Sequence, residues 1–196
     1  MPVYLINISK YNLLISIKFS WRILDEKMEI QEVHIHQHGK GFQNYLKKKN
    51  EVVVSEENGT EKLNTTLKKI REIINDYFEG KNLDLYNTIQ NLNIDLNLEG
   101  KFKSKFSLGV IQVLLKTRPG ETTDYYTIAR KIGTKAYRAV GNILRNNPLP
   151  LIIPCHRVIR KNGNLGGFSG AIGDCWETRL KKLLLRIEGA SGFSGN

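Results

Sequence analysis

The hydrophobic periodicity of this chain changes along its length, and this change limits the possible folds more than any other feature. Residues 3–19 are rich in β-branched and apolar side chains, residues 29–36 show a two-residue alternation, and residues 52–54 are three valines. Such patterns are typical of strands. The start of the chain therefore predicts a small β-sheet.

A helical period follows. Apolar side chains of residues 64–78 fall on one helix face, with Asn64 or Thr65 placed to cap the helix and Gly80 placed to end it. Residues 82–99 are rich in asparagine and predict an irregular or weakly stranded connector. Together these segments predict an α/β N-terminal supporting domain over residues 1–100, built from a small sheet plus a helix.

The second half predicts a mostly helical domain over residues 101–196. An apolar stripe begins after Ser104 and stops at Pro119-Gly120, and Asp124 then stands at the N-cap position of a short helix over residues 125–132. Gly133 separates this helix from another over residues 134–146. Two short helices joined by a glycine-containing turn predict a helix-turn-helix.

Prolines and glycines recur in the rest of this half. Pro148, Pro150 and Pro154 predict an extended stretch, because proline is excluded from helix interiors. Residues 163–173 hold five glycines and predict a loop, and residues 178–187 predict a closing basic amphipathic helix.

Charge is distributed unequally between the two halves. Residues 1–100 carry 13 basic and 14 acidic residues, whereas residues 101–196 carry 17 and 5, so the net charge of +11 comes from the second half. This segregation favours a nucleic-acid partner over a solvated basic surface. A membrane is not expected, because the sequence has neither a spanning segment nor a basic helix with large aromatics opposite.

Cysteine usage predicts a reducing compartment. The chain has Cys155 and Cys175 but no disulfide framework, and polar residues interrupt any secretory segment near the N-terminus. We therefore expect a cytoplasmic protein.

Cys155 lies in the run Ile152-Ile153-Pro154-Cys155-His156-Arg157-Val158. A cysteine after two isoleucines is usually a buried, inert side chain. His156 and Arg157 oppose this interpretation, because a nearby cation favours the thiolate, the nucleophilic form. Pro154 fixes the backbone before the thiol, and the later glycines can wall a pocket.

This run resembles the active-site signature of the O6-alkylguanine-DNA alkyltransferases. The resemblance includes Arg145-Asn146-Asn147-Pro148 before the run and Gly166-Gly167-Phe168-Ser169-Gly170 after it. It extends to Gly120-Glu121-Thr122-Thr123-Asp124-Tyr125, Arg138-Ala139-Val140-Gly141 and Glu188-Gly189, and so covers residues 105–189. Several motifs in one order are far more specific than a single match.

The resemblance implies a single-turnover DNA repair reaction that needs no cofactor. Cys155 would accept the alkyl group from O6 of guanine, His156 would be its base through a water, and Glu188 would orient His156. Asn147 would brace the turn that presents the cysteine.

The resemblance also implies contacts to substrate and DNA. Tyr125 would donate to a ring nitrogen of the guanine, Ser169 and Gly170 would hold O6, and backbone groups near Val158 would contact the exocyclic amine. Arg138 would fill the space of the flipped nucleotide in double-stranded DNA. A face of small residues on the second helix would fit the minor groove: Ala136, Ala139 and Gly141. Helix packing is the other explanation of those small residues.

Other features are not expected to carry chemistry. His34, His36 and His38 alternate along one predicted strand, but structural zinc sites usually include thiolates, so no metal is expected. Asp174-Cys175-Trp176 lie in a stretch that the family lacks, and Phe168 stands where the family has tyrosine. The resemblance implies that the partner is double-stranded DNA containing O6-alkylguanine, and we expect a monomer.

Two other functions fit parts of the sequence. A DNA-binding regulator or a lesion-marking protein would explain the charge and the helix pair, but not Cys155 followed by His156. A cysteine hydrolase would explain the thiol, but adjacent Cys155 and His156 are poorly placed for direct proton transfer.

Overall fold

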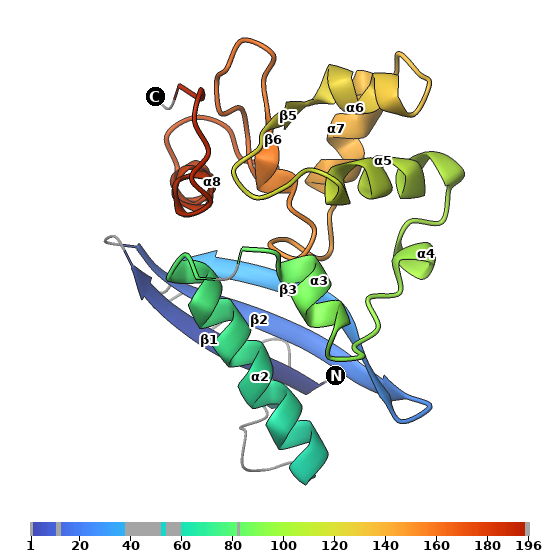
Figure 1. The fold of residues 1–196 in the computed structure, drawn as a ribbon, viewed down its shortest axis with the longest axis vertical. Helices are drawn as coiled ribbons and strands as arrows, with labels where there is room; N and C mark the ends of the chain where they lie inside the picture. The colour runs from blue at the N-terminus through green and yellow to red at the C-terminus, as the bar shows by residue number, and fades with distance from the viewer. Residues whose placement is uncertain (1, 11–12, 38–51, 54–59, 82, 195–196) are drawn as a thin grey trace. The chain divides into compact units, whose positions relative to one another are not determined.

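The computed structural model describes residues 2–10, 13–37, 52–53, 60–81 and 83–194. The chain divides into two compact units, Met1–Asn97 and Leu98–Asn196 (Figure 1). The first contains a sheet with helices and the second is mostly helical, so the predicted α/β class is confirmed. The predicted boundary at Gly100 lies inside α4 (Leu98–Lys101), at the start of the second unit.

The sheet of the first unit has the order β3-β2-β1-β4. β1 (Pro2–Lys10), β2 (Leu13–Leu24) and β3 (Lys27–Gln37) are antiparallel neighbours, and β4 (Val52–Val53) is parallel to β1. The strand predicted over residues 29–36 is confirmed, whereas the apolar run from residue 3 to residue 19 forms two strands. Val54 and His38 lie outside the described residues.

The core of the first unit lies between the sheet and α2 (Glu61–Phe78), which packs on β1. α2 buries the predicted apolar face: Leu67, Ile70, Ile74, Tyr77 and Phe78. The predicted start was wrong, because the N-cap is Thr60, whose side chain accepts a hydrogen bond from the Leu63 amide.

The predicted connector over residues 82–99 was also wrong in part. It contains α3 (Leu85–Gln90), whose N-cap Asp84 accepts from the Asn87 amide at 3.2 Å. Beyond α3, Asp95 exchanges backbone hydrogen bonds of 2.8 and 2.9 Å with β3, so this part is weakly stranded as expected. Local side-chain caps, rather than apolar periodicity, thus define α3.

Three helices follow α4 in the second unit. α5 (Lys105–Leu115) starts with a capping box at Ser104, and α6 (Tyr125–Lys131) starts at the predicted cap Asp124, which accepts from two amides at 2.9 and 3.0 Å. α7 (Tyr137–Arg145) contacts α6 and completes the predicted helix-turn-helix. α7 begins at Tyr137 rather than at residue 134, and Ala136 is its N-cap.

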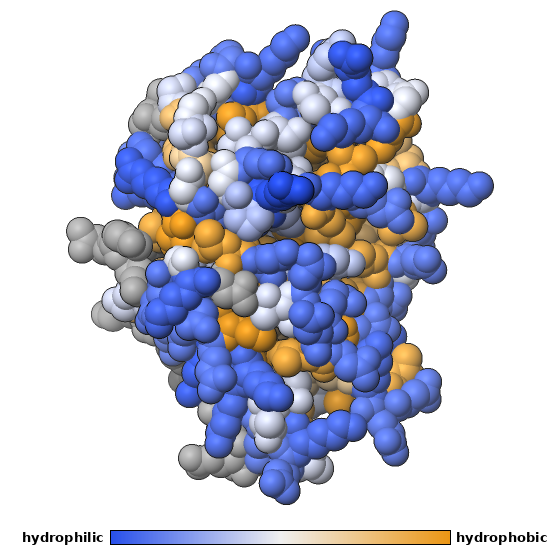
Figure 2. Space-filling model, in the orientation of Figure 1, coloured by the Kyte–Doolittle hydropathy of each residue, from blue (hydrophilic) through white to orange (hydrophobic). Residues whose placement is uncertain are grey.

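Hydrophilic side chains cover much of the visible surface (Figure 2).

The stretch after α7 is not extended throughout, contrary to the prediction. Leu151 has a φ of 72° inside a turn, and Cys155–Arg157 form the short 3-10 helix η1. β6 (Val158–Ile159) follows at once and pairs in parallel with β5 (Thr123–Asp124). The glycine-rich loop then leads to α8 (Trp176–Ile187), which packs against η1. This arrangement places Cys155 between the helix-turn-helix and α8.

Candidate active site

The Asn147 side chain holds Cys155 in position. The Asn147 side-chain amide donates to the Ile153 carbonyl at 3.1 Å and to Cys155 Sγ at 3.3 Å. Its oxygen accepts from the Leu149 amide at 3.0 Å. One side chain therefore spans both ends of the turn that leads to the thiol.

A buried ionic cluster lies directly after the cysteine. His156 Nε2 lies 2.9 Å from Glu188 Oε1, and both side chains are fully buried. Arg157 donates from Nε to Glu188 Oε2 at 2.8 Å, from Nη2 to Glu188 Oε1 at 2.9 Å and from Nη1 to the Thr117 carbonyl at 2.6 Å. The extra residues after Gly170 therefore leave Glu188 beside His156.

The protonation states within this cluster follow from burial and charge. Burial alone would raise the pKa of Glu188, but His156 and Arg157 outweigh it and lower that pKa to about 2. Burial lowers the pKa of His156 and outweighs the opposing effect of Glu188. At neutral pH His156 is thus a neutral imidazole that donates from Nε2 to ionised Glu188, which leaves Nδ1 as the acceptor nitrogen.

Lys181 provides a cation that the sequence analysis missed. It is 1% exposed, and its Nζ donates to the carbonyls of Val158 at 2.6 Å, Leu165 at 2.5 Å and Gly167 at 3.1 Å. Its position three and four residues before Leu184 and Leu185 puts it on the apolar face of α8, and this spacing could have revealed it. Lys181 ties β6 to the glycine-rich loop.

Burial has the largest effect on the protonation of the Cys155 thiol. It raises the pKa of Cys155, while the hydrogen bond from Asn147 and the charge of Lys181 oppose that rise. Burial also lowers the pKa of Lys181 to about 8, and the charge of Cys155 opposes that lowering. The side-chain cation that favours the thiolate is therefore Lys181, whereas the predicted cation Arg157 is held by Glu188.

Cys155 opens into a pocket of about 290 Å³. Six of the residues around it come from α6, α7 and the glycine-rich loop: Tyr125, Gly141, Arg145, Phe168, Ser169 and Gly170. Burial raises the pKa of the Tyr125 hydroxyl, which therefore stays protonated and able to donate. The loop is tightly built, because a Cβ on Gly167 would lie 2.5 Å from the Ala171 carbonyl oxygen.

The small residues predicted on the second helix do not share one environment. Ala136 and Arg138 are exposed, Ala139 is half-buried, and Gly141 lines the thiol pocket, where its missing side chain would meet the Tyr125 ring at 3.7 Å. Val158 is buried at the start of β6, and its carbonyl accepts from Lys181. Gly141 therefore makes room within the pocket rather than on the outer face of the helix.

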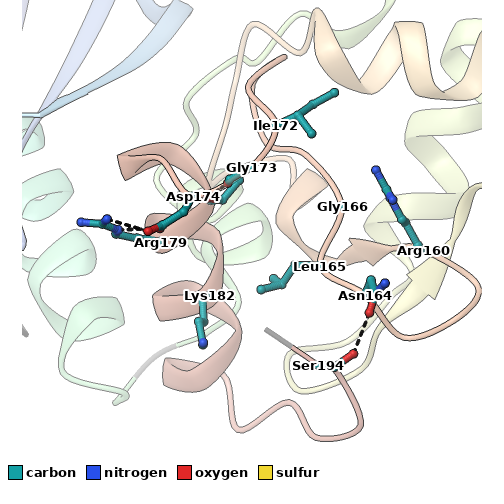
Figure 3. A pocket seen from close by; sticks show the side chains of 11 residues that line it. Arg160, Asn164, Leu165, Gly166, Ile172, Gly173, Asp174, Arg179, Lys182 and Ser194 are labelled. Atoms are coloured by element: carbon teal, nitrogen blue, oxygen red, sulfur yellow. Dashed lines mark hydrogen bonds and ion pairs between the residues drawn. The ribbon is translucent and has the colours of Figure 1, made fainter. Parts of the chain in front are cut away.

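A second hollow of about 300 Å³ shares Arg160, Gly166 and Ile172 with the thiol pocket (Figure 3). Asp174 and Arg179 pair at its edge with distances of 2.8 and 2.9 Å. The side chains of Arg160 and Lys182 lie on different sides of Leu165 (Figure 3), so these two cations do not converge on one point. Asp174, from the extra stretch, helps to build this hollow and not the thiol pocket.

The described residues include no group of three or more His, Cys, Asp and Glu side chains that could hold a metal ion. His34 pairs with Glu32 at 2.9 Å. Among the same residues, no helix is long and apolar enough to cross a membrane.

Comparisons with known proteins match the second unit most clearly. The family model described as 6-O-methylguanine DNA methyltransferase, DNA binding domain, matches residues 105–190. A methylated-DNA–protein-cysteine methyltransferase of Metallosphaera sedula is 38% identical over 117 residues, which are 60% of this chain and 64% of the relative. A protein of the same name from Saccharolobus solfataricus is 41% identical over 113 residues, which are 58% of this chain and 63% of the relative. The chain thus spans less than two thirds of these relatives.

Solved structures share the fold over both units. The O6-methylguanine-DNA methyltransferase of Pyrococcus kodakaraensis superposes with a TM-score of 0.61 at 21% identity, covering 96% of this chain and 99% of that one. The Mycobacterium tuberculosis OGT in complex with DNA gives 0.66 at 22% identity, covering 96% and 93%. The matched domain and the motifs around Cys155 show that residues 105–190 are similar to the DNA-binding domain of the O6-alkylguanine-DNA alkyltransferases, and both units share the fold of solved structures of such proteins.

Proposed function

We propose that this protein repairs DNA by transferring the alkyl group from O6 of guanine to the Cys155 thiol, once per molecule. The observation that carries the proposal is the position of Cys155. Its sulfur opens into a pocket beside Tyr125, is held by Asn147, and adjoins a buried His156–Glu188 pair. An inert buried cysteine would need neither an open pocket nor such neighbours.

The chemistry is one displacement at carbon. His156 takes the thiol proton through a water, with its acceptor nitrogen set by the bond from Nε2 to Glu188. The sulfur then forms a bond to the alkyl carbon while the bond from that carbon to O6 breaks, and its electron pair stays on the guanine. The Tyr125 hydroxyl donates to a ring nitrogen of the leaving base as negative charge develops. The leaving base takes up a proton, which the protonated His156 gives back through water, so the products are a thioether, neutral His156 and an unmodified guanine.

The reaction should stop after one turnover. A thioether has no carbonyl that water could attack and no good leaving group, unlike the acyl intermediate of a cysteine hydrolase. The buried carboxylate of Glu188 is occupied by His156 and Arg157 and cannot serve as a second nucleophile. Each protein molecule should therefore repair one lesion.

DNA binding belongs to residues 101–196 in this proposal. The pocket is too small for a base pair, so the modified nucleotide must leave the duplex stack. Arg138 is exposed near the start of α7 and would fill the vacated space, and exposed Ala136 and half-buried Ala139 would let the helix approach a narrow groove. Ser169, Gly170 and backbone groups near Val158 would hold the base, and the first unit would support this domain.

A titration tests the single-turnover reaction. A fixed amount of protein is mixed with excess oligonucleotide that carries one O6-methylguanine, and the repaired guanine is counted over time. We expect one equivalent in a burst and no further repair. Cys155→Ser should repair nothing and still bind DNA, while Cys175→Ser, at the N-cap of α8, should behave as wild type. Repair that continues beyond one equivalent would exclude the proposed reaction.

A second experiment tests the role of Arg138. We expect Arg138→Ala to slow repair of duplex DNA far more than reaction with the free base O6-benzylguanine, because only the duplex needs base flipping. Lys105→Ala, at the exposed first position of α5, is the control and should leave the ratio of the two rates unchanged. Equal losses on both substrates would remove Arg138 from this role.

A further inference from the structure

The helix-turn-helix also carries a groove of about 400 Å³ that is distinct from the thiol pocket. We call it the tyrosine groove, and it is lined by Tyr126, Arg130, Gly133, Thr134, Lys135 and Tyr137. It shares none of these residues with the thiol pocket. It is therefore a separate feature that the proposed displacement does not use.

Aromatic side chains are unusually exposed at this groove. Tyr126 is 44% exposed and Tyr137 is 47% exposed, and no other described aromatic residue is among the exposed large apolar side chains. Single exposed apolar side chains are ordinary on a protein surface, but these two rings line one groove and can both contact the same partner.

The groove is also strongly cationic. Arg130 Cζ lies 5.9 Å from the centre of the Tyr126 ring and Lys161 Nζ lies 4.9 Å from it, and Lys135 lines the groove directly. Asp124 offsets part of the charge of Lys161, which lowers the Asp124 pKa. The sequence has no Asp or Glu between Asp124 and Asp174, so no acidic side chain of that stretch offsets Arg130 and Lys135. Rings and cations together match a base with its phosphate, whereas an uncharged aromatic partner would not need the cations.

The tyrosine groove and the thiol pocket are neighbours on the same two helices. On α6, Tyr125 lines the thiol pocket and the next residue, Tyr126, lines the groove. On α7, Tyr137 lines the groove, and Gly141, four residues and about one turn later, lines the thiol pocket. A DNA strand that places one nucleotide at Cys155 can therefore reach the groove with a nearby nucleotide.

We propose that the tyrosine groove binds an unstacked base of single-stranded DNA close to the modified guanine, with Tyr137 as the stacking surface and Arg130 and Lys135 near the phosphates. This proposal rests on the proposed function and extends it to lesions in single strands, where no base pair has to be opened. Base stacking on an aromatic ring is tolerant of sequence, which suits a lesion that can occur anywhere.

Binding to a single-stranded oligonucleotide with unmodified guanine tests the groove without any reaction. We expect Tyr137→Ala to weaken binding about 5- to 150-fold, the range for losing one stacked base, and Tyr137→Phe to bind as wild type. The salt dependence should stay the same in Tyr137→Ala, because no phosphate contact is lost. In Lys135→Gln it should fall, with a slope smaller by about 0.7. Tyr86→Ala, on α3 of the other unit, is the matched control and should change nothing.

An abasic scan identifies the bound base. Each base of the oligonucleotide is removed in turn while its phosphate is kept. We expect one position near the lesion site at which this removal weakens binding to the wild type and has no further effect in Tyr137→Ala. Equal affinities of wild type and Tyr137→Ala, or the same loss at that position in both proteins, would overturn the proposal.

The reaction with free O6-benzylguanine separates this proposal from the proposed function and checks folding. Tyr137→Ala should alkylate Cys155 at the wild-type rate, since the free base needs only the thiol pocket. If wild type is not alkylated at all, the proposed function fails. If it is alkylated but Tyr137→Ala binds the single strand as tightly as wild type, only the tyrosine groove proposal fails.

Discussion

Replacing Glu188 by glutamine should destabilise the second unit severely. In the native protein one carboxylate accepts three hydrogen bonds, one from His156 and two from Arg157, and all three side chains are at most 7% exposed. An amide can accept from one oxygen only and carries no charge. Arg157 would keep its contact with the Thr117 carbonyl but would lose its anion.

The size of the effect follows from that unpaired charge. Removing one partner of a buried ion pair costs about 3–5 kcal/mol. In a domain of this size each kcal/mol shifts the melting temperature by about 4–8 °C, so Glu188→Gln should melt at least about 12 °C lower. Glu177→Gln, in the first turn of the same helix, is the control and should cost about 1 kcal/mol or less.

The pH dependence gives an independent test of the same reasoning. The pKa of Glu188 is about 2 in the folded protein and ordinarily 4.5, so its ionised form stabilises the fold at pH above 4.5. This stabilisation, about 3 kcal/mol, is lost as the pH falls from 4.5 towards 2. Thermal melts should therefore show the gap between wild type and Glu188→Gln closing over that range. Equal melting temperatures at pH 7, or a gap that does not depend on pH, would refute the reasoning.

Three further variants test the packing around the thiol. Gly167→Ala should cost about 1–3 kcal/mol and slow alkyl transfer, because its Cβ would lie 2.5 Å from the Ala171 oxygen; urea unfolding and the rate with O6-benzylguanine measure both effects. Gly141→Ala should be neutral or stabilise by about 1 kcal/mol, since its Cβ fits 3.7 Å from the Tyr125 ring, and a loss in urea unfolding would contradict this. Lys181 has a folded pKa of about 8 against 10.5, so its protonation favours the unfolded state between those values and wild type should gain stability as pH rises. Lys181→Met should lack that gain in urea unfolding measured across the same pH range.

The sequence predicted the start of a helix correctly where that start depends on a neighbouring side chain. Asp124 caps α6 as expected, because an N-cap aspartate and the following helix are adjacent in sequence. The start of α2 was missed because Glu61 and Lys62 form a polar first turn that leaves no mark on the apolar period. The start of α7 was missed because the Thr134 hydroxyl accepts from the Ala136 amide, which keeps residues 134–136 out of the helix.

The candidate site was predictable only in part, for a different reason. The motifs around Cys155 indicated which residues to consider, and the pocket joins several of them. The bond between His156 and Glu188 spans 32 positions, so its geometry depends on how α8 packs on η1. For the same reason the sequence pointed to His156 and Arg157 as the cations near the thiol, whereas the fold brings Lys181 there.

The mass of the intact protein after incubation with DNA containing one O6-methylguanine tests the central claim most directly. The account predicts that the protein gains one methyl group, that peptide mapping places it on Cys155, and that the amount of methylated protein equals the amount of repaired guanine. A methyl group on Cys175, or guanine repaired without any methylated protein, would contradict it.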